Sequence, residues 1–226
     1  MQAGVAYEWL MDRAESTLCD HFDAHVLASV YSLAIAETRT SGISLSEGTG
    51  ARTNGLRRMI GDVFPQALPL LDDFVACNEL FIPEDERSLR ELLTRFSTHG
   101  SPFEQHLAAL VARRAMRPNH LWQDLGLRNR GELSELMHRH FASLARRNVN
   151  DMKWKKFLYR MICRDEGFRL CTAPSCAECG DFAVCFGDES GESLLARNRR
   201  NAELSAAGVT VQILPARPTE VRQTTI

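Results

Sequence analysis

Four cysteines lie within 15 residues near the C-terminal end of the chain, close enough for their thiolates to meet at one metal centre. They are Cys171, Cys176, Cys179 and Cys185, in the spacing C-x4-C-x2-C-x5-C. The first 11 residues have neither the basic start nor the apolar run of a secretory signal, so a reducing, cytoplasmic setting is expected. In that setting, clustered thiols favour a metal site over disulfide bonds.

The spacing also bears on which metal is bound. Structural zinc sites commonly use two close cysteine pairs that a longer stretch of chain separates. Here the four cysteines form one compact run, and its first three members match the plant-type iron–sulfur spacing, in which the fourth cysteine is distant. Soft thiolates suit clusters of iron and heavier metals. The spacing therefore favours a sulfur cluster and leaves zinc open.

The segments that flank the cysteines extend this pattern. They are residues 119–127 (NHLWQDLGL), 152–160 (MKWKKFLYR), 173–176 (APSC) and 185–187 (CFG). Together with the cysteine spacing, they resemble the NifQ family of nitrogen-fixation proteins. The resemblance is strong over residues 101–188 and weaker before them.

The resemblance implies a function and a site. NifQ proteins serve as molybdenum donors in the synthesis of the nitrogenase iron–molybdenum cofactor. By that resemblance, Cys171, Cys176, Cys179 and Cys185 hold a Mo–Fe–S cluster that is built on an iron–sulfur precursor. The implied partners are molybdate and the nitrogenase cofactor assembly proteins, namely the scaffold and the iron protein. The chain would then act as a carrier and not as an enzyme.

Two further residues are candidate accessory ligands. Cys163 precedes Cys171 by eight positions, near the end of a predicted helix. It could act as a spare ligand during loading, although a buried free thiol is the commoner role. His120 could contact molybdate or a partner, or could simply be a satisfied polar residue between two helices.

The net charge of −2 conceals a strong segregation of charge. Residues 1–110 carry a net charge of −8, residues 111–160 carry +8 and residues 161–226 carry −2. A basic block of this kind attracts anions or acidic protein surfaces. Within it, four basic side chains on the predicted helix before the cysteines could balance the cluster, attract molybdate or contact a partner. They are Lys153, Lys155, Lys156 and Arg160.

A regulatory protein is the alternative function. Residues 121–137 resemble a helix-turn-helix, so the four cysteines could hold zinc or an iron–sulfur cluster in a transcription factor. Glu132 and Glu135 on the second helix would meet phosphates unfavourably, so no nucleic-acid partner is expected. Motifs of serine hydrolases, zinc proteases and phosphate-binding loops are absent from the sequence, which further disfavours an enzyme.

The elements that must position these residues are predicted to be helical. The composition, with 44% hydrophobic and 25% charged residues, is that of a soluble globular protein, and no apolar run is long enough to cross a membrane. We predict a mainly α, compact helical bundle: one domain, 1–188, ending in the cysteine-rich loop 171–185, and a partly disordered extension, 189–226. Predicted helices cover about 5–38, 84–96, 102–116, 130–144 and 151–163, with a loop at 41–55 and one strand at 209–214.

Overall fold

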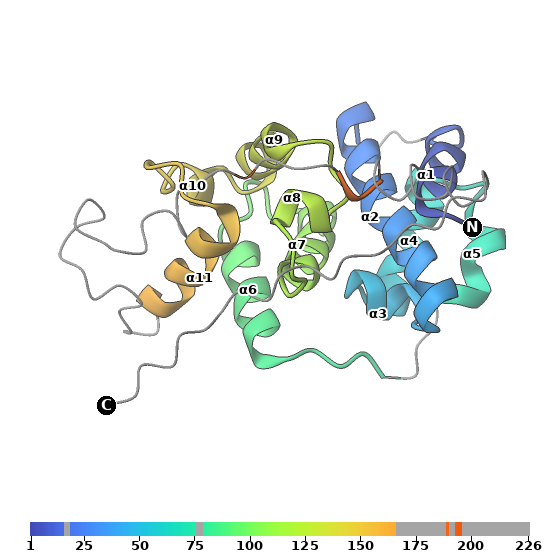
Figure 1. Cartoon of the computed structure of the whole chain (residues 1–226), viewed down its shortest axis with the longest axis horizontal. Helices are drawn as coiled ribbons and strands as arrows, with labels where there is room; N and C mark the ends of the chain where they lie inside the picture. The colour runs from blue at the N-terminus through green and yellow to red at the C-terminus, as the bar shows by residue number, and fades with distance from the viewer. Residues whose placement is uncertain (16–18, 76–78, 166–188, 190–192, 196–226) are drawn as a thin grey trace, which may run out of the picture.

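A computed structural model of the chain describes residues 1–15, 19–75, 79–165, 189 and 193–195. Within these ranges the chain forms eleven helices and no strand, which confirms the predicted mainly helical fold (Figure 1). The predicted cysteine-rich loop, the strand at 209–214 and most of the predicted extension 189–226 lie outside the described residues. The helices are α1 (Ala3–Met11), α2 (His21–Ser41), α3 (Leu45–Thr49), α4 (Thr53–Val63), α5 (Leu68–Val75), α6 (Glu84–Arg95), α7 (Pro102–Ala115), α8 (Leu121–Asp124), α9 (Arg130–His140), α10 (Ala142–Ala145) and α11 (Trp154–Asp165).

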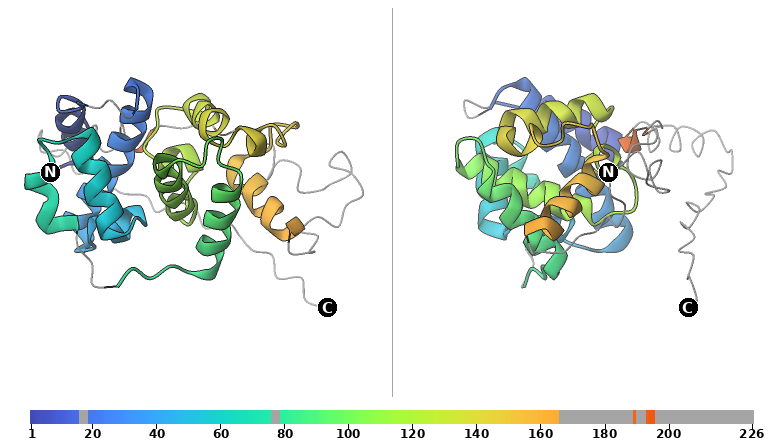
Figure 2. Two further views of the ribbon diagram at one scale, coloured as in Figure 1. Left: turned by 180° about the vertical axis from the view of Figure 1, so that it is seen from behind. Right: turned by 90° about the vertical axis from the view of Figure 1, so that its left-hand side faces the viewer.

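The helices form an elongated body with α7 near its centre (Figures 1 and 2). Helices α1 to α5 gather around α2 at one end, and α6 to α11 form the other end. Helix α7 contacts α3 and α4 on one side and α6 and α8 on the other. One continuous apolar core includes residues from α1 through α11, so the two ends share the same buried interior.

Local signals in the sequence explain where several helices begin. Ser101 caps α7 by accepting a hydrogen bond from the backbone N–H of Glu104, and Pro102 occupies the first turn, as predicted. Helix α6 begins directly after Pro83 with three acidic residues in its first turn, also as predicted. Asn129 caps α9 by accepting from the backbone N–H of Glu132 at 3.2 Å.

Two expectations for the N-terminal part are wrong. The single helix predicted over 5–38 is divided into α1 and α2, because Asp20 caps a new helix by accepting from the backbone N–H of Asp23 at 3.0 Å. The predicted loop at 41–55 contains the short helix α3, which a reciprocal capping box between Ser44 and Glu47 stabilises. In both places a local side-chain cap outweighs the composition of the surrounding segment.

Two boundaries in the C-terminal part also differ from the prediction. The helix predicted through residue 144 is interrupted at Phe141, whose backbone (φ −135°, ψ 44°) is not helical, and α10 follows. The last helix begins at Trp154, three residues later than expected, and Asp151 before it has a positive φ of 52°. The apolar faces are as predicted: Leu133, Leu136 and Met137 are fully buried.

Gly126 allows the chain to turn closely against α2 between α8 and α9. Its φ is 77°, and a Cβ at this position would lie 2.9 Å from the carbonyl oxygen of Ser29. We expect Gly126→Ala to lower the free energy of unfolding by about 2 kcal/mol, because an L-residue is strained there and clashes with α2. Urea denaturation would measure the change. Gly55→Ala is the matched control, because open space surrounds Gly55 in α4; equal effects of the two substitutions would contradict this interpretation.

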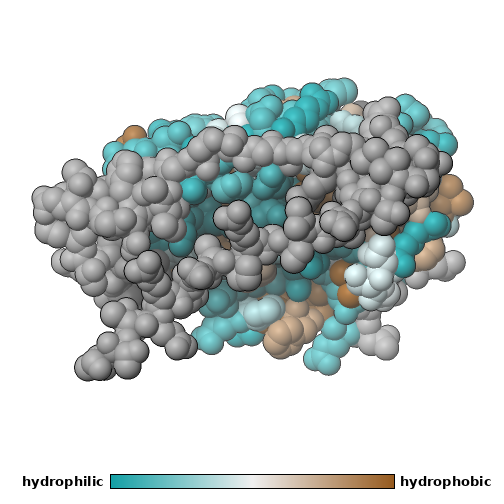
Figure 3. All heavy atoms as spheres, in the orientation of Figure 1, coloured by the Kyte–Doolittle hydropathy of each residue, from teal (hydrophilic) through white to brown (hydrophobic). Residues whose placement is uncertain are grey.

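The described surface is mostly polar. In the face shown in Figure 3, hydrophilic residues predominate and hydrophobic side chains emerge in separate small patches. The exposed hydrophobic residues include Leu70 and Phe74 of α5. Among the described residues, no helix combines the length and apolar character needed to cross a membrane.

Candidate metal centre and its anchors

All four predicted metal ligands, Cys171, Cys176, Cys179 and Cys185, lie outside the described residues. The structure describes what flanks them: α11, which ends at Asp165, and then Glu189. Cys163 falls within α11, but its side chain also lies outside the description. Within the described part of the chain, no group of three or more His, Cys, Asp or Glu side chains could hold a metal ion.

Glu189, four residues after Cys185, is anchored to the helical body. Its carboxylate lies 3.2 Å from Nδ1 of His120 through one oxygen and 2.9 Å from Nε of Arg130 through the other. The Glu189 side chain is only 5% exposed. We call Glu189, His120 and Arg130 the carboxylate clasp. It holds the chain that leaves the cysteine segment against the start of α8 and the start of α9.

The ion pair within the clasp is close but poorly aligned. The N–H of Arg130 Nε and the Glu189 oxygen near it are both buried, and neither has a well-directed hydrogen bond. The contact therefore acts through charge in a site largely shielded from water, where electrostatic attraction is stronger than at an exposed surface. Such a pair depends on the carboxylate remaining ionised and in place.

Arg130 also contacts the chain directly before α11. Its Nη2 donates to the carboxylate of Asp151 at 2.7 Å and to the carbonyl oxygen of Met152 at 3.1 Å. Residues 151 and 152 lie just before α11, the helix that leads toward Cys171. One guanidinium thus contacts Glu189, which follows the cysteine motif, and the residues directly before α11, so Glu189 and the start of α11 lie in the same part of the fold.

The predicted accessory residue His120 therefore has a defined position. It precedes α8, its backbone N–H donates to the side chain of Gln123 at 3.2 Å, and its side chain is 32% exposed. Its Nδ1 faces Glu189. The structure places His120 beside the end of the cysteine segment, and its role as a ligand stays a prediction.

The four basic residues on α11 have different surroundings. Lys155 is half-buried and paired: its Nζ lies 2.6 Å from the carboxylate of Asp124 and donates to the carbonyl oxygen of Arg117. Burial lowers the pKa of Lys155, and the charge of Asp124 opposes this shift. Lys156 and Arg160 are exposed and Lys153 is half-buried. The charge of Lys155 is thus paired within the fold, and contact of the four residues with molybdate or a partner stays a prediction.

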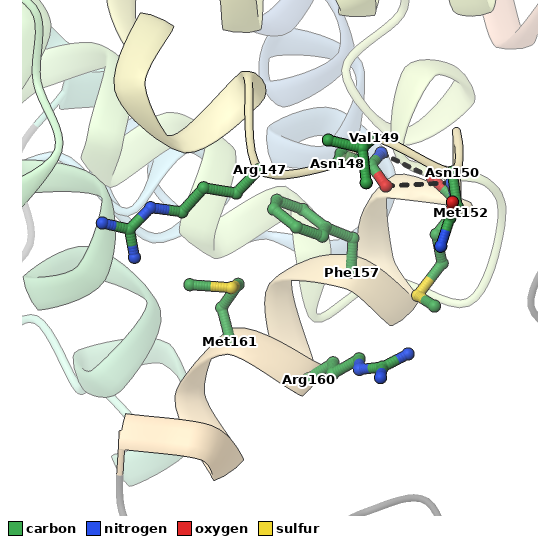
Figure 4. A pocket seen from close by; sticks show the side chains of 8 residues that line it. All are labelled: Arg147, Asn148, Val149, Asn150, Met152, Phe157, Arg160 and Met161. Carbon is green, nitrogen blue, oxygen red and sulfur yellow. Dashed lines mark hydrogen bonds between the residues drawn. The ribbon is translucent and has the colours of Figure 1, made fainter. Parts of the chain in front are cut away.

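Arg160 borders a pocket of about 370 Å³ between α11 and the loop that precedes it. Figure 4 shows Phe157 and Met161 of α11 at the apolar centre of this pocket, with the guanidinium groups of Arg147 and Arg160 at its two ends. The guanidinium of Arg147 also lies over the ring of Phe96, 4.4 Å from its centroid.

The helix-turn-helix alternative gains no support from the arrangement of α8 and α9. Helix α8 has only four residues. On α9, Arg130 is bound to Glu189 and Asp151, and Arg139 forms ion pairs with Asp20, Asp23 and Glu135. These arginines are engaged with carboxylates of the same chain, and the apolar face of α9 is buried in the core.

Sequence reasoning did not identify Glu189, Arg130 or Asp124 as residues of this region. Glu189 follows the cysteine motif within a segment of mixed composition, and Asp124 lies 31 residues from its partner Lys155. No local pattern marks such pairs. The one available signal was the placement of residues 119–127 among the segments that resemble NifQ, since Asp124 and His120 both lie there.

Comparison with known proteins identifies the family. The family model described as NifQ matches residues 26–187, which include all four cysteines of the motif. A NifQ homolog of Sinorhizobium fredii is 38% identical over 172 residues, 76% of this chain and 75% of that protein. NifQ of Rhodobacter capsulatus is 41% identical over 105 residues, 46% of this chain and 58% of that protein.

A third relative agrees. NifQ of Azotobacter vinelandii is 40% identical over 106 residues, covering 47% of this chain and 54% of that protein. No solved structure matches the chain significantly. The family match spans well over half of the chain and includes the complete cysteine motif. The chain therefore belongs to the NifQ family.

Proposed function

We propose that the chain carries molybdenum in a Mo–Fe–S cluster on Cys171, Cys176, Cys179 and Cys185 and donates it for synthesis of the nitrogenase iron–molybdenum cofactor. Membership of the NifQ family implies a role in nitrogen fixation and in the handling of molybdenum. The observation that carries the finer proposal is the complete C-x4-C-x2-C-x5-C motif within the matched region. Thiolates are the soft ligands that iron–sulfur and related clusters require.

The charges around the described anchors are compatible with this cargo. Four thiolates bring four negative charges, which the metal ions of a cluster offset only in part. Exposed Lys156 and Arg160 on α11 would moderate the remaining charge and attract the anion molybdate. In this proposal molybdate adds to an iron–sulfur precursor on the cysteines, and the scaffold and iron protein of the cofactor assembly machinery are the receiving partners. The chain acts as a carrier and not as a catalyst.

Metal analysis of the full chain tests this function. The protein should be purified without exposure to oxygen from cells that are supplied with molybdate. We expect molybdenum and iron together, with the visible absorption of an iron–sulfur chromophore. Stoichiometric zinc alone, in a colourless protein, would refute the carrier function and favour a structural zinc site.

We expect the carboxylate clasp to slow the release of metal from the cysteines. Glu189→Gln keeps the size of the side chain but removes the charge that faces His120 and Arg130. A carrier whose cysteine segment is less well anchored should lose metal faster. We expect transfer of molybdenum to a chelator to accelerate about tenfold, because the variant loses the charge attraction that holds Glu189 in a partly buried site. Stopped-flow absorption of the cluster would follow the loss.

Glu135→Gln provides the control for the clasp. Glu135 also pairs with an arginine on α9, but the pair is exposed, so little change in release is expected. If Glu189→Gln and Glu135→Gln release metal at the wild-type rate, the clasp does not control retention of the cargo.

A further inference from the structure

A pocket of about 810 Å³ lies on the helical body close to the clasp. Its walls come from α2, from the connection between α7 and α8, and from the start of α1. Leu194 of the described fragment 193–195 completes the wall. Figures 1 and 2 show this orange fragment beside α2, near the N-terminus. The pocket is therefore lined by the same stretch of chain that follows the cysteine motif and passes through the clasp.

The charged side chains of this pocket are predominantly basic. Arg39, Arg114 and Arg117 line it together with the carboxylates of Glu37 and Asp124. Asp124 is already neutralised, because Lys155 lies 2.6 Å away. Among the lining side chains, the three arginines exceed the two carboxylates by one charge, and Lys155, outside the lining, compensates Asp124.

Both carboxylates are occupied by partners within the fold. Glu37 accepts from Nη1 of Arg114 at 2.6 Å and from Nη2 of Arg117 at 3.0 Å, so that one carboxylate orders two guanidinium groups. Asp124 accepts from Asn119 at 2.8 Å in addition to its contact with Lys155. These pairs hold the arginines in position, and an incoming anion would meet carboxylates whose charge is already compensated.

One of the arginines, Arg114, has a buried donor without an acceptor, and a second, Arg39, is exposed at the pocket. The side chain of Arg114 is only 2% exposed, and its Nε has no hydrogen-bond partner among the described residues. Burial lowers the pKa of Arg114, and the charge of Glu37 opposes that shift. Arg39 takes part in none of the ion pairs formed between described residues. Guanidinium groups held in fixed positions, one with an unpaired donor and one open to solvent, offer the charged donors that bind oxyanions.

We propose that this pocket binds a tetrahedral oxyanion and is the place where molybdate first associates with the chain. The identification with molybdate rests on the proposed function; the oxyanion chemistry rests on the arginines. Leu194 follows Cys185 by nine residues, so the bound anion would be held next to the chain that carries the cluster ligands. The pocket is larger than one oxyanion, which would therefore enter with part of its hydration shell.

Binding of molybdate to a chain without the cluster ligands tests this proposal. The full-length protein, with Cys171, Cys176, Cys179 and Cys185 replaced by serine, should be dialysed to equilibrium against labelled molybdate. We expect saturable binding of one anion per chain. Arg39→Gln and Arg117→Gln should each weaken it about tenfold or more, since each removes a charged donor. Arg58→Gln, which alters an exposed arginine on α4, should bind as the parent does.

The outcomes separate this proposal from the proposed function. Absence of saturable binding, or equal binding by the two arginine variants and the parent, overturns the pocket even if the wild-type chain carries a Mo–Fe–S cluster. Arginine-dependent binding in a chain whose wild-type form never contains molybdenum supports the pocket and refutes the carrier. Sulfate has the same charge and shape: retention of molybdate in a tenfold excess of sulfate supports molybdate as the ligand, and complete displacement overturns it.

Discussion

Cys179→Ser is expected to leave the purified chain almost without molybdenum and with much less iron. A serine hydroxyl stays protonated at neutral pH and is a hard oxygen donor, so it cannot replace a thiolate on a soft cluster. Loss of one of four ligands should reduce bound molybdenum at least about tenfold, because even outer-shell changes cost metal sites about 10–100-fold in affinity. Elemental analysis after anaerobic purification measures the effect.

The control for this substitution is another cysteine of the same chain. Cys19 is half-buried, lies directly before the cap of α2 and is outside the motif. Cys19→Ser should retain both metals at the wild-type ratio. Equal metal content in the two variants would refute the assignment of Cys179 as a ligand, and loss of metal in both would indicate a general effect on folding.

Lys155→Met is expected to destabilise the fold by about 3 kcal/mol, because removal of one member of a buried ion pair leaves the other charge uncompensated. Asp124 is only 2% exposed. Without Lys155, the side chain of Asn119 would be the one hydrogen-bond donor left to its carboxylate among the described side chains. For a chain of this length, about 3 kcal/mol corresponds to a fall in Tm of about 6–12 °C. Thermal unfolding followed by circular dichroism would show the shift.

Two further variants make the experiment specific. Lys156→Met changes the neighbouring lysine, which is exposed, and should shift the free energy of unfolding by less than about 0.5 kcal/mol. Asp124→Asn combined with Lys155→Met removes both charges and should recover part of the lost stability. If Lys155→Met is as stable as Lys156→Met, the pair of Lys155 with Asp124 does not stabilise the fold.

The pairing of Lys155 with Asp124 also affects how the basic residues of α11 should be tested. A triple substitution of Lys153, Lys155 and Lys156 would confuse loss of folding with loss of docking, because Lys155 pairs with the buried carboxylate of Asp124. Variants of exposed Lys156 and Arg160 test attraction of an anion or partner without that complication.

Several elements of the fold follow from short sequence signals. Ser101 and Pro102 mark the start of α7, and Pro83 with three acids marks the start of α6, because caps act within a few residues of themselves. The buried face of α9 follows from the spacing of Leu133, Leu136 and Met137. The break between α1 and α2 does not follow from composition, because helix-favouring residues lie on both sides of it. The Asp20 cap is the local signal that marks the start of α2.

By itself, the sequence determined the set of candidate ligands, since the spacing of Cys171, Cys176, Cys179 and Cys185 is a property of adjacent residues. It also determined that the chain is helical, because helical periodicity is local. Only the tertiary structure decided that Arg130 contacts both Glu189 and the residues before α11, that Lys155 pairs with the buried carboxylate of Asp124, and that three arginines share a pocket with Leu194. These contacts depend on how α2, α7, α8, α9 and α11 pack. Residues such as Glu37 and Arg114 are 77 positions apart, so no local sequence pattern indicates that they form a pair.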